Sequence, residues 1–386
     1  MTRVTVVVLT YNRQRVLRRH LLYYANRPIH IIFADGSQSD WDGGSSGSIG
    51  AMTWEYFRQD GFSSYFSRMF EASLRTNSEF VALLDDEEVL LWSGIQKSIS
   101  FLDQNSEHSS AGGQVYTTTL TRKRLSLVPH YADYNSFDLL DDDPLSRFGK
   151  LFNTKRTKSF YYRLIRTPDF KIFAHVMKNF NTAGKYAPLA EFQLLGVLAL
   201  FGKQTACDFP FHIRNGGSQH AHTALNQVAI SKEDIIDSCK NFQKACRLRD
   251  SRASSNSALI SVSALENLMS GRVERVNNKI KFAEVSENSN KFYSKICGFA
   301  RRQKNVFIDY LGTSCFDYFP ALYHFVCPKG RKTFAYTAET YAPGNQEIFS
   351  DFRLIEEIWT KFPDGLKESQ FKENLRGLIG LEAKNI

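Results

Sequence analysis

The sequence predicts an α/β protein in which a mostly parallel sheet, flanked by helices, occupies residues 1–229 and a mainly α-helical region occupies residues 230–386. Residues 4–9 form a continuous run of Val, Thr and Leu, which is typical of a strand buried on both faces of a parallel sheet. Apolar residues then recur near the helical period over residues 13–26, and residues 30–34 predict a second strand. Strand, helix and strand in this order form a βαβ unit, from which parallel sheets are built.

The remaining elements continue this alternation as far as residue 213, and helices predominate after residue 230. Gly, Ser and Asp predict a surface loop over residues 40–50, and polar residues predict an irregular segment over residues 133–158. In the first helix, the arginines are expected to form a solvated face; they are Arg15, Arg18 and Arg19. Further strands are predicted at 52–57, 79–84, 111–119, 125–128 and 207–213, further helices at 63–76, 92–104, 188–201, 231–248, 264–275 and 349–361, and a linker at 251–263.

The composition is that of a globular protein without a concentrated charge. With 386 residues, of which 42% are hydrophobic, the chain is long enough to bury one large core or two medium ones. The net charge of +9 is spread evenly, with +4 over residues 1–229 and +5 over residues 230–386. This argues against a nucleic-acid partner and leaves weak attraction to an anionic membrane surface open. The six cysteines form no Cys-x-x-Cys pair and are expected to be free thiols.

The sequence also bears on location. Thr2-Arg3 is followed at once by the first strand, so no secretory leader is expected. The longest strongly apolar stretch, residues 192–201, has about half of the ~20 residues that a membrane-spanning helix needs. We therefore expect a cytoplasmic protein, with peripheral contact at the inner membrane as a further option.

Three acids, Asp85-Asp86-Glu87, follow directly on the strand predicted at 79–84. In open α/β sheets ligands bind beyond the carboxyl ends of the strands, so these acids are expected to face a ligand crevice. Acids at alternate positions can hold a hard divalent cation, which binds two phosphates and stabilises a diphosphate leaving group. The alternative is an exposed acidic turn that only ends the strand.

Two shorter motifs end the first and second strands and are expected to face the same crevice. In Thr10-Tyr11-Asn12-Arg13, the ring of Tyr11 could stack on a nucleobase. In Ala34-Asp35-Gly36-Ser37, the carboxylate of Asp35 could accept hydrogen bonds from a base or a ribose. The alternatives are ordinary packing for Tyr11 and a turn-forming role before glycine for Asp35.

Together, three segments resemble successive landmarks of the family-2 glycosyltransferases in order and spacing: Val6 to Arg13, Phe33 to Ser37 and Leu83 to Glu88. The sequence is similar, more narrowly, to a bacterial subgroup of these enzymes from surface-polysaccharide clusters, over roughly residues 1–220. The resemblance implies the GT-A fold, which is Rossmann-like. It also implies transfer of a sugar, with inversion, from a nucleotide-diphosphate donor to a hydroxyl of a glycan or lipid-linked acceptor.

The resemblance further implies roles for residues at the strand ends. Asp85 and Glu87 correspond to the acids that bind Mg or Mn and the donor diphosphate. The earlier family positions contact the base, commonly uracil, so a UDP-sugar is the first candidate donor. The donor-binding residues implied in this sequence are Thr10, Tyr11, Arg13, Asp35 and Asp86.

Two positions depart from the family pattern. Glu87 stands where Asp is usual, and its side chain is longer by one methylene, so it could reach the metal directly or through water. Ala34 stands where the family usually has a second acid, which leaves Asp35 as the carboxylate at that strand end.

An inverting transfer needs a general base that deprotonates the acceptor hydroxyl. The family has this acid about a hundred residues beyond the metal motif, and Glu191 lies 106 residues beyond Asp85 at the start of a predicted helix. The alternative for Glu191 is a carboxylate that only stabilises the helix N-terminus. Asp169 is the second candidate for the base.

Histidines and arginines near the last predicted strand are further candidates. His220 could complete the metal shell in a closing segment made flexible by Gly216-Gly217, although loop histidines are commonly surface residues. All members of this group are expected to follow the last strand, and the others are His212, Arg214 and His222. Arg163 and Arg166 could meet an acidic acceptor, with a solvated face as the alternative.

Two other functions fit part of this pattern. A sugar-nucleotide nucleotidyltransferase shares the sheet and an acid pair but usually has a glycine-rich basic loop after the first strand, where this sequence has Thr10-Tyr11-Asn12-Arg13. A non-catalytic glycan- or nucleotide-binding module would keep its function when Asp85 or Glu191 is replaced, whereas a transferase would lose turnover.

Overall fold

The structure is a computed structural model of the 386-residue chain. The chain divides into two compact units, residues 1–272 with 336–386 and residues 273–335, and every element named below belongs to the first. The residues that the structure describes are 2–59, 61, 65–121, 124–130, 138–153, 161–180, 187–215, 230–253, 260–271, 273–274, 277, 351, 353–355 and 357–359.

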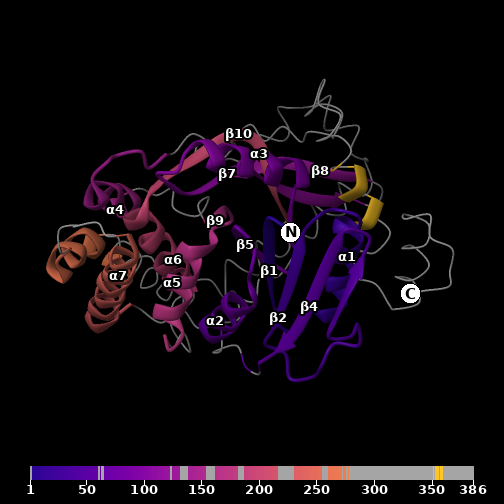
Figure 1. The fold of residues 1–386 in the computed structure, drawn as a ribbon, viewed down its shortest axis with the longest axis horizontal. Helices are drawn as coiled ribbons and strands as arrows, with labels where there is room; N and C mark the ends of the chain where they lie inside the picture. The colour runs from indigo at the N-terminus through magenta and orange to yellow at the C-terminus, as the bar shows by residue number, and fades with distance from the viewer. Residues whose placement is uncertain are drawn as a thin grey trace, which may run out of the picture. The chain divides into compact units, whose positions relative to one another are not determined.

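A mixed sheet of ten strands forms the centre of this unit (Figure 1). In spatial order the strands are β3 (Ser46–Ile49), β4 (Met52–Arg58), β2 (His30–Asp35), β1 (Val4–Thr10), β5 (Phe80–Asp85), β9 (Leu164–Arg166), β7 (His108–Thr121), β10 (Lys203–Asn215) and β6 (Val89–Leu90), with β8 (Arg124–His130) paired to β7. Strands β4, β2, β1 and β5 are parallel to one another, and β7 is parallel to β10. Because β9 is antiparallel to both β5 and β7, these two run in the same direction. The predicted α/β class is confirmed.

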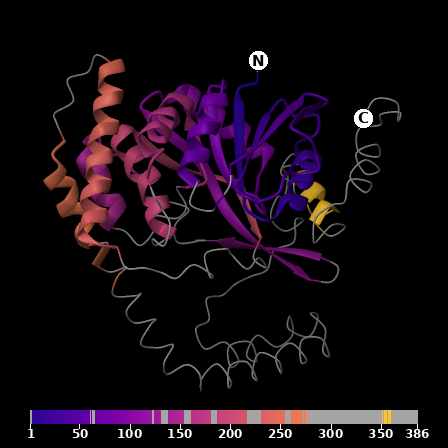
Figure 2. The same ribbon diagram turned by 90° about the horizontal axis from the view of Figure 1, so that it is seen from below.

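Helices flank the sheet and pack on one another at one end of the unit. They are α1 (Leu17–Tyr24), α2 (Tyr65–Arg75), α3 (Trp92–Gln104), α4 (Pro144–Asn153), α5 (Thr167–Met177), α6 (Ala187–Phe201) and α7 (Lys232–Ala253), and a short 3-10 turn, Gln14–Val16, precedes α1. Helix α7, orange in both views, packs against α5 and α6, and α4 packs against α6 (Figures 1 and 2). Within the described part of the chain, no helix is long and apolar enough to cross a membrane. The described parts of residues 230–386 are mainly helical, as predicted.

Several predicted elements need correction. The segment 133–158 is not irregular throughout, because α4 lies within it; Asp143 caps this helix by accepting a hydrogen bond from the Ser146 amide (2.7 Å). The predicted loop at 40–50 contains β3, and α5 was not predicted. The described cysteines are free thiols, as predicted, and are Cys207, Cys239 and Cys246; the other three lie outside the described residues.

The prediction that Arg18 and Arg19 form a solvated face is wrong, because both side chains are buried. The Arg18 guanidinium pairs with Asp42 (2.8 Å) and lies over the ring of Trp41, at 5.6 Å from its centroid. Residues of the segment before β3 thus cover this side of α1. Helical periodicity alone does not register such a cover, since it comes from a distant part of the sequence.

Polar side chains of α1 fix the chain that follows β5. The Nε2–H of His20 donates to the Asp86 carbonyl (2.9 Å), and burial lowers the pKa of His20 to about 4, so its imidazole is neutral at pH 7. The Tyr24 hydroxyl donates to the Leu90 carbonyl (2.9 Å), and the Tyr23 hydroxyl accepts from the Trp92 amide (3.1 Å). Side chains of α1 therefore bind the backbone at three points from Asp86 to Trp92.

A segment near the C-terminus packs onto the same core. Asp351 is buried; it pairs with Arg27 (2.8 Å) and accepts hydrogen bonds from the Ser93 amide (3.0 Å) and hydroxyl (2.8 Å) at the start of α3. The apolar side chains that follow belong to the buried core around β1 and α1, and are Ile355, Ile358 and Trp359. The domain boundary at residue 229 stays a prediction.

Replacing Asp351 with Ala should lower the free energy of unfolding by about 2 kcal/mol, because Arg27 loses its charged partner and the first turn of α3 loses an acceptor. Urea unfolding followed by circular dichroism measures this change. The control is Asp237→Ala, which removes an exposed acid of α7 that pairs only with Lys240 on the same helix in the described contacts. Equal stability of the two variants would contradict the packing of this segment.

Candidate functional site

Three strand ends that carry the predicted site residues lie side by side at the carboxyl edge of the sheet. In the parallel register, Thr10 at the end of β1 pairs with Asp35 at the end of β2, and Leu9 pairs with Asp85 at the end of β5. The crevice expected from the sequence therefore has its residues on adjacent strands, where parallel α/β sheets bind ligands.

The acidic turn after β5 alternates between accessible and buried side chains. Asp85 and Glu87 are half-buried, whereas Asp86 and Glu88 are 6% and 3% exposed. Asp85 and Glu87 are the two acids that the sequence predicted to bind a metal, and that role stays a prediction. Asp86 and Glu88 instead point into the protein and bind its own groups.

Asp86 is bound by residues of β1 and the turn that follows it. The Thr10 hydroxyl donates to Asp86 Oδ2 (2.7 Å), so two residues predicted to bind the donor bind each other here. Burial raises the pKa of Asp86 to about 7, and the hydrogen bond from Thr10 and the charge of Arg13 oppose this rise only in part. In this conformation the buried Asp86 carboxylate ties the acidic turn to the end of β1.

Arg13 lies beside the acids as a partly exposed cation. Its guanidinium is 3.1 Å from Glu87 Oε2 and 3.6 Å from Asp86 Oδ1, and its side chain is 29% exposed. A partly exposed guanidinium next to the half-buried Glu87 suits a ligand that carries phosphates, since it can bind a phosphate oxygen directly. Tyr11, the residue predicted to stack on a base, follows β1 with a half-buried side chain.

Asp35 is fully buried and is engaged by protein donors. Its Oδ1 accepts from the Ser37 amide (2.8 Å) and hydroxyl (2.5 Å), and its Oδ2 accepts from Gln14 (2.7 Å) and the Tyr56 hydroxyl (2.8 Å). Burial and the neighbouring carboxylate raise the pKa of Tyr56, which keeps this phenol a donor. Asp35 thus fixes the turn after β2, and a direct contact with a base stays a prediction.

A buried arginine that the sequence did not indicate joins two of the strand ends. Arg68 of α2 donates to the carbonyls of Thr10 (2.9 Å) and Ala34 (2.8 Å) and is 2% exposed. Burial lowers its pKa to about 10, so it remains charged at neutral pH. A Cβ at Gly36 would lie 2.9 Å from its guanidinium carbon, which explains the glycine in the Asp-Gly-Ser motif. That glycine was the one sequence signal for the contact.

His212 and Arg214 lie within β10 and not after it, which corrects the prediction. Both bind Glu88: His212 Nε2 is 2.8 Å from Oε2, and Arg214 Nε is 2.8 Å from Oε1. Burial alone would raise the pKa of Glu88, but the charges and hydrogen bonds of His212 and Arg214 lower it to about 2. His220, His222 and the Gly216-Gly217 pair lie outside the described residues.

The arginines near residue 163 also differ from the solvated face considered above. Arg163 is 1% exposed and donates to the Thr205 carbonyl (2.8 Å), and burial lowers its pKa to about 9. Arg166 donates to the carbonyls of His108 (2.8 Å) and Leu102 (2.7 Å). Both arginines bind backbone carbonyls inside the unit.

Asp169 lies near the amino end of β5, whereas Asp85 lies at its carboxyl end. It follows β9, whose Arg166 pairs with Phe80 at the start of β5. Its carboxylate is buried and pairs with Arg249 of α7 (3.4 Å), and burial raises its pKa. Asp169 is therefore unsuited to act as a base in the crevice.

Glu191 belongs to the first half of α6. This helix leads directly into the amino end of β10, and near its end the Leu198 carbonyl accepts a hydrogen bond from Ser109, near the start of β7 (2.9 Å). The first turns of α6 therefore lie away from the amino ends of β7 and β10. The side chain of Glu191 lies outside what the structure describes.

The accessible acids fit a cation that is shared with a diphosphate. Mg usually binds one or two carboxylates together with substrate phosphates and water, and Asp85 and Glu87 supply two carboxylates. Among the described residues, no group of three or more His, Cys, Asp or Glu side chains is arranged to hold a metal by itself. A ligand phosphate would have to complete such a shell.

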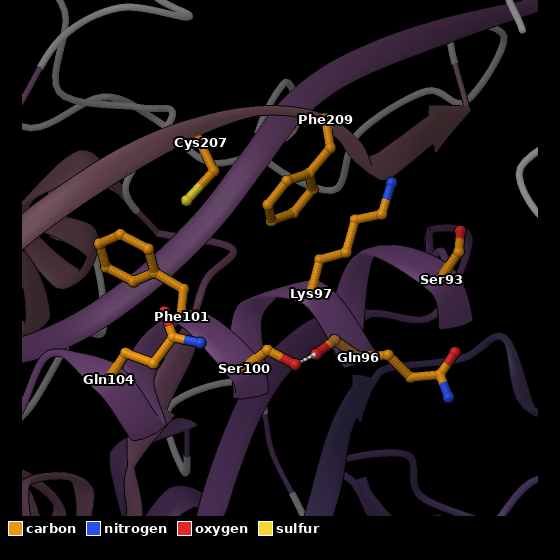
Figure 3. A pocket seen from close by; sticks show the side chains of 8 residues that line it. All are labelled: Ser93, Gln96, Lys97, Ser100, Phe101, Gln104, Cys207 and Phe209. Atoms are coloured by element: carbon orange, nitrogen blue, oxygen red, sulfur yellow. Dashed lines mark hydrogen bonds between the residues drawn. The ribbon is translucent and has the colours of Figure 1, made fainter. Parts of the chain in front are cut away.

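A hollow of about 560 Å³ lies elsewhere, between α3 and β10 (Figure 3). Phe101 and Lys97 of α3 face Phe209 and Cys207 of β10 across it, and Lys97 Nζ is 5.8 Å from the Phe209 ring centroid. None of the predicted site residues lines it. The carboxyl ends of β1, β2 and β5 therefore remain the candidate site.

Neither a protein-family model nor a curated protein matches the sequence. Among solved structures, the chain is similar to S. aureus TarS 1–349 in complex with UDP-GlcNAc, with a TM-score of 0.41 and 12% identity over 70% of this chain and 72% of that chain. It is similar to the complex of TarS 1–349 with UDP at a TM-score of 0.39 and 12% identity, over 70% and 71% of the two chains. A likeness at this level assigns no activity and no residue role, so the site rests on its own geometry.

Proposed function

We propose that this chain is a glycosyltransferase that transfers a sugar from a nucleotide-diphosphate donor, a UDP-sugar being the first candidate, to a hydroxyl of a glycan or lipid-linked acceptor in bacterial surface-polysaccharide synthesis. One observation carries this proposal. The ends of β1, β2 and β5 are adjacent, and they carry the half-buried Asp85 and Glu87, with the partly exposed guanidinium of Arg13 next to Glu87.

The charges at this edge suit a diphosphate leaving group. Negative charge develops on the diphosphate as its bond to the sugar breaks, and fixed cations stabilise that charge. Arg13 can bind a phosphate oxygen, and Asp85 and Glu87 would hold a bound Mg or Mn, with His220 as a further proposed ligand. When bound, the metal supplies electrostatic stabilisation of the leaving group without proton transfer.

The proposed donor-binding residues have different parts in this site. Tyr11 would stack on the base, and Asp35 would fix the turn that faces the base or ribose. Thr10 and Asp86 bind each other and thereby fix the position of the acidic turn relative to β1. Donor recognition would thus combine direct contacts with a pre-formed support.

Glu191 is the proposed general base. The oxygen of the acceptor hydroxyl forms a bond to the anomeric carbon, the hydroxyl proton passes to the Glu191 carboxylate, and the bond from that carbon to the diphosphate oxygen breaks. Attack from the face opposite the leaving group inverts the anomeric configuration. The direction of α6 and the position of Asp169 near the amino end of β5 both support this choice.

Two other functions make different predictions. A sugar-nucleotide nucleotidyltransferase would release pyrophosphate from a nucleoside triphosphate and a sugar phosphate; the absence of glycine from Thr10-Tyr11-Asn12-Arg13 argues against its phosphate loop. A non-catalytic glycan- or nucleotide-binding module would bind a ligand without turnover.

We further propose that residues 230–386 serve acceptor binding, assembly or peripheral contact with the inner membrane, on the cytoplasmic side.

The wild-type protein should bind and slowly hydrolyse at least one nucleotide sugar in the presence of Mn, and Asp85→Asn should lower that turnover about 100-fold or more because the diphosphate charge is no longer neutralised. A thermal-shift and hydrolysis screen of nucleotide sugars, with and without Mn, measures both effects, since a ligand that binds the folded state raises its stability.

The matched control for Asp85→Asn is Glu79→Gln, which changes an acid just before the start of the same strand that pairs with Arg3 (2.6 Å). This variant should keep the wild-type turnover. Absence of any metal-dependent binding or turnover with every donor would contradict the transferase proposal, and pyrophosphate release from UTP with a sugar phosphate would favour the nucleotidyltransferase.

Glu191→Ala should keep donor binding and lower transfer to the acceptor by about 10²- to 10⁴-fold, the range expected when a general base is lost. Isothermal titration with the donor and a transfer assay separate the two effects. Asp169 is the second candidate for the base in the sequence analysis. A folded Asp169→Asn variant should retain transfer. Transfer by Glu191→Ala at the wild-type rate would rule out Glu191 as the base.

A further inference from the structure

We propose that Tyr162 is a positioning residue of the acidic turn: its hydroxyl orients the Asp85 carboxylate, and a cluster formed by Glu88, His212 and Arg214 holds its ring. This inference rests on the proposed function, because Asp85 is there the principal carboxylate of the diphosphate site. Neither the sequence motifs nor the resemblance pointed to Tyr162 in this role.

The contact with Asp85 is direct. The Tyr162 hydroxyl donates to Asp85 Oδ2 at 2.8 Å, and Tyr162 is 6% exposed. Its location follows from the sheet: Leu164 of β9 pairs with Ala82 of β5 in antiparallel register, so the residues before Leu164 run alongside the carboxyl end of β5. Tyr162 therefore reaches the end of the strand that carries Asp85.

The ring of Tyr162 is held by two side chains of β10. The His212 ring lies against it, with centroids 4.3 Å apart and planes inclined by 30°. The Arg214 guanidinium lies over the same ring at 5.5 Å from its centroid. Each contact limits rotation of the ring and thereby fixes the position of the hydroxyl oxygen.

Glu88 anchors both of these β10 side chains. It is 3% exposed and lies 2.8 Å from a nitrogen of His212 and 2.8 Å from a nitrogen of Arg214. His212 is fully buried and pairs with Leu90 of β6 in the sheet. Since Glu88 belongs to the acidic turn itself, the contacts run from the turn to β10, from β10 to Tyr162, and from Tyr162 back to Asp85.

This closed set of contacts has a chemical consequence. A hydrogen bond from a fixed phenol to one carboxylate oxygen determines the rotation of the carboxylate and hence the direction in which its other oxygen points. Partners of this kind, behind a metal- or ligand-binding carboxylate, commonly change affinity or activity by about 10- to 100-fold when they are removed. Tyr162 would thus act on the reaction through Asp85 and without contacting the donor.

The test is Tyr162→Phe, which removes the hydroxyl and keeps the ring between His212 and Arg214. We expect a kcat for donor hydrolysis about 10- to 100-fold below wild type, weaker binding of UDP with Mn by a similar factor, and a nearly unchanged melting temperature. In the Asp85→Asn background, the same substitution should leave the binding of UDP with Mn unchanged, because the residue through which Tyr162 acts is already altered.

The matched control is Tyr161→Phe, since the neighbouring Tyr161 is also buried but its hydroxyl bonds to that of Tyr65. It should retain wild-type kcat and binding. Wild-type behaviour of Tyr162→Phe, or an equal loss in both tyrosine variants, would overturn the positioning role while leaving the proposed function intact. Absence of Mn-dependent UDP binding and of turnover in the wild-type protein would overturn both proposals together.

Discussion

The parallel register of β1, β2 and β5 is the constraint on which the rest of the site depends. Parallel strands that start in register also end in register, so residues far apart in the sequence, Thr10, Asp35 and Asp85, become neighbours at one edge. At the ends of β1 and β2 the buried Arg68 donates to the carbonyls of Thr10 and Ala34, and the Gly36 amide also donates to the Thr10 carbonyl. The positive charge of Arg68 also offsets the negative charges of the nearby carboxylates Asp35 and Asp86.

The acids at this edge divide into those that hold the structure and those that remain accessible. Asp86 binds Thr10 and Glu88 binds His212 and Arg214, so two of the four consecutive acids serve to fix the turn. Each buried carboxylate has a donor or cation partner, which is what makes its burial tolerable. Because the turn is fixed on both sides, Asp85 and Glu87 are presented in a set direction, and this pre-organisation is what electrostatic stabilisation of a leaving group requires.

The sequence was sufficient for the parts of the fold that depend on local patterns. The β-branched run of β1, the apolar run of β5 and the acids that end β5 located the parallel centre and the strand end where Asp85 and Glu87 lie half-buried; their binding role stays a prediction. Contacts between distant segments were beyond such patterns. From the sequence, Arg18 is expected to be a solvated helical residue, but in the fold Trp41 and Asp42 cover it. Likewise, no sequence pattern near Tyr162 indicates that its hydroxyl contacts Asp85. The roles of Glu191 and His220 stay predictions, since the described side chains include neither.

Photo-crosslinking with a UDP-sugar that carries an azide on the uracil tests most directly that the carboxyl edge of β1, β2 and β5 is a nucleotide-sugar site. Mass spectrometry of the digested protein identifies the labelled peptide, and excess UDP shows whether the label is specific. We expect UDP-sensitive labelling of the peptides that contain Tyr11 or the turn after Asp35. Labelling of the hollow between α3 and β10, or labelling that UDP does not reduce, would contradict it.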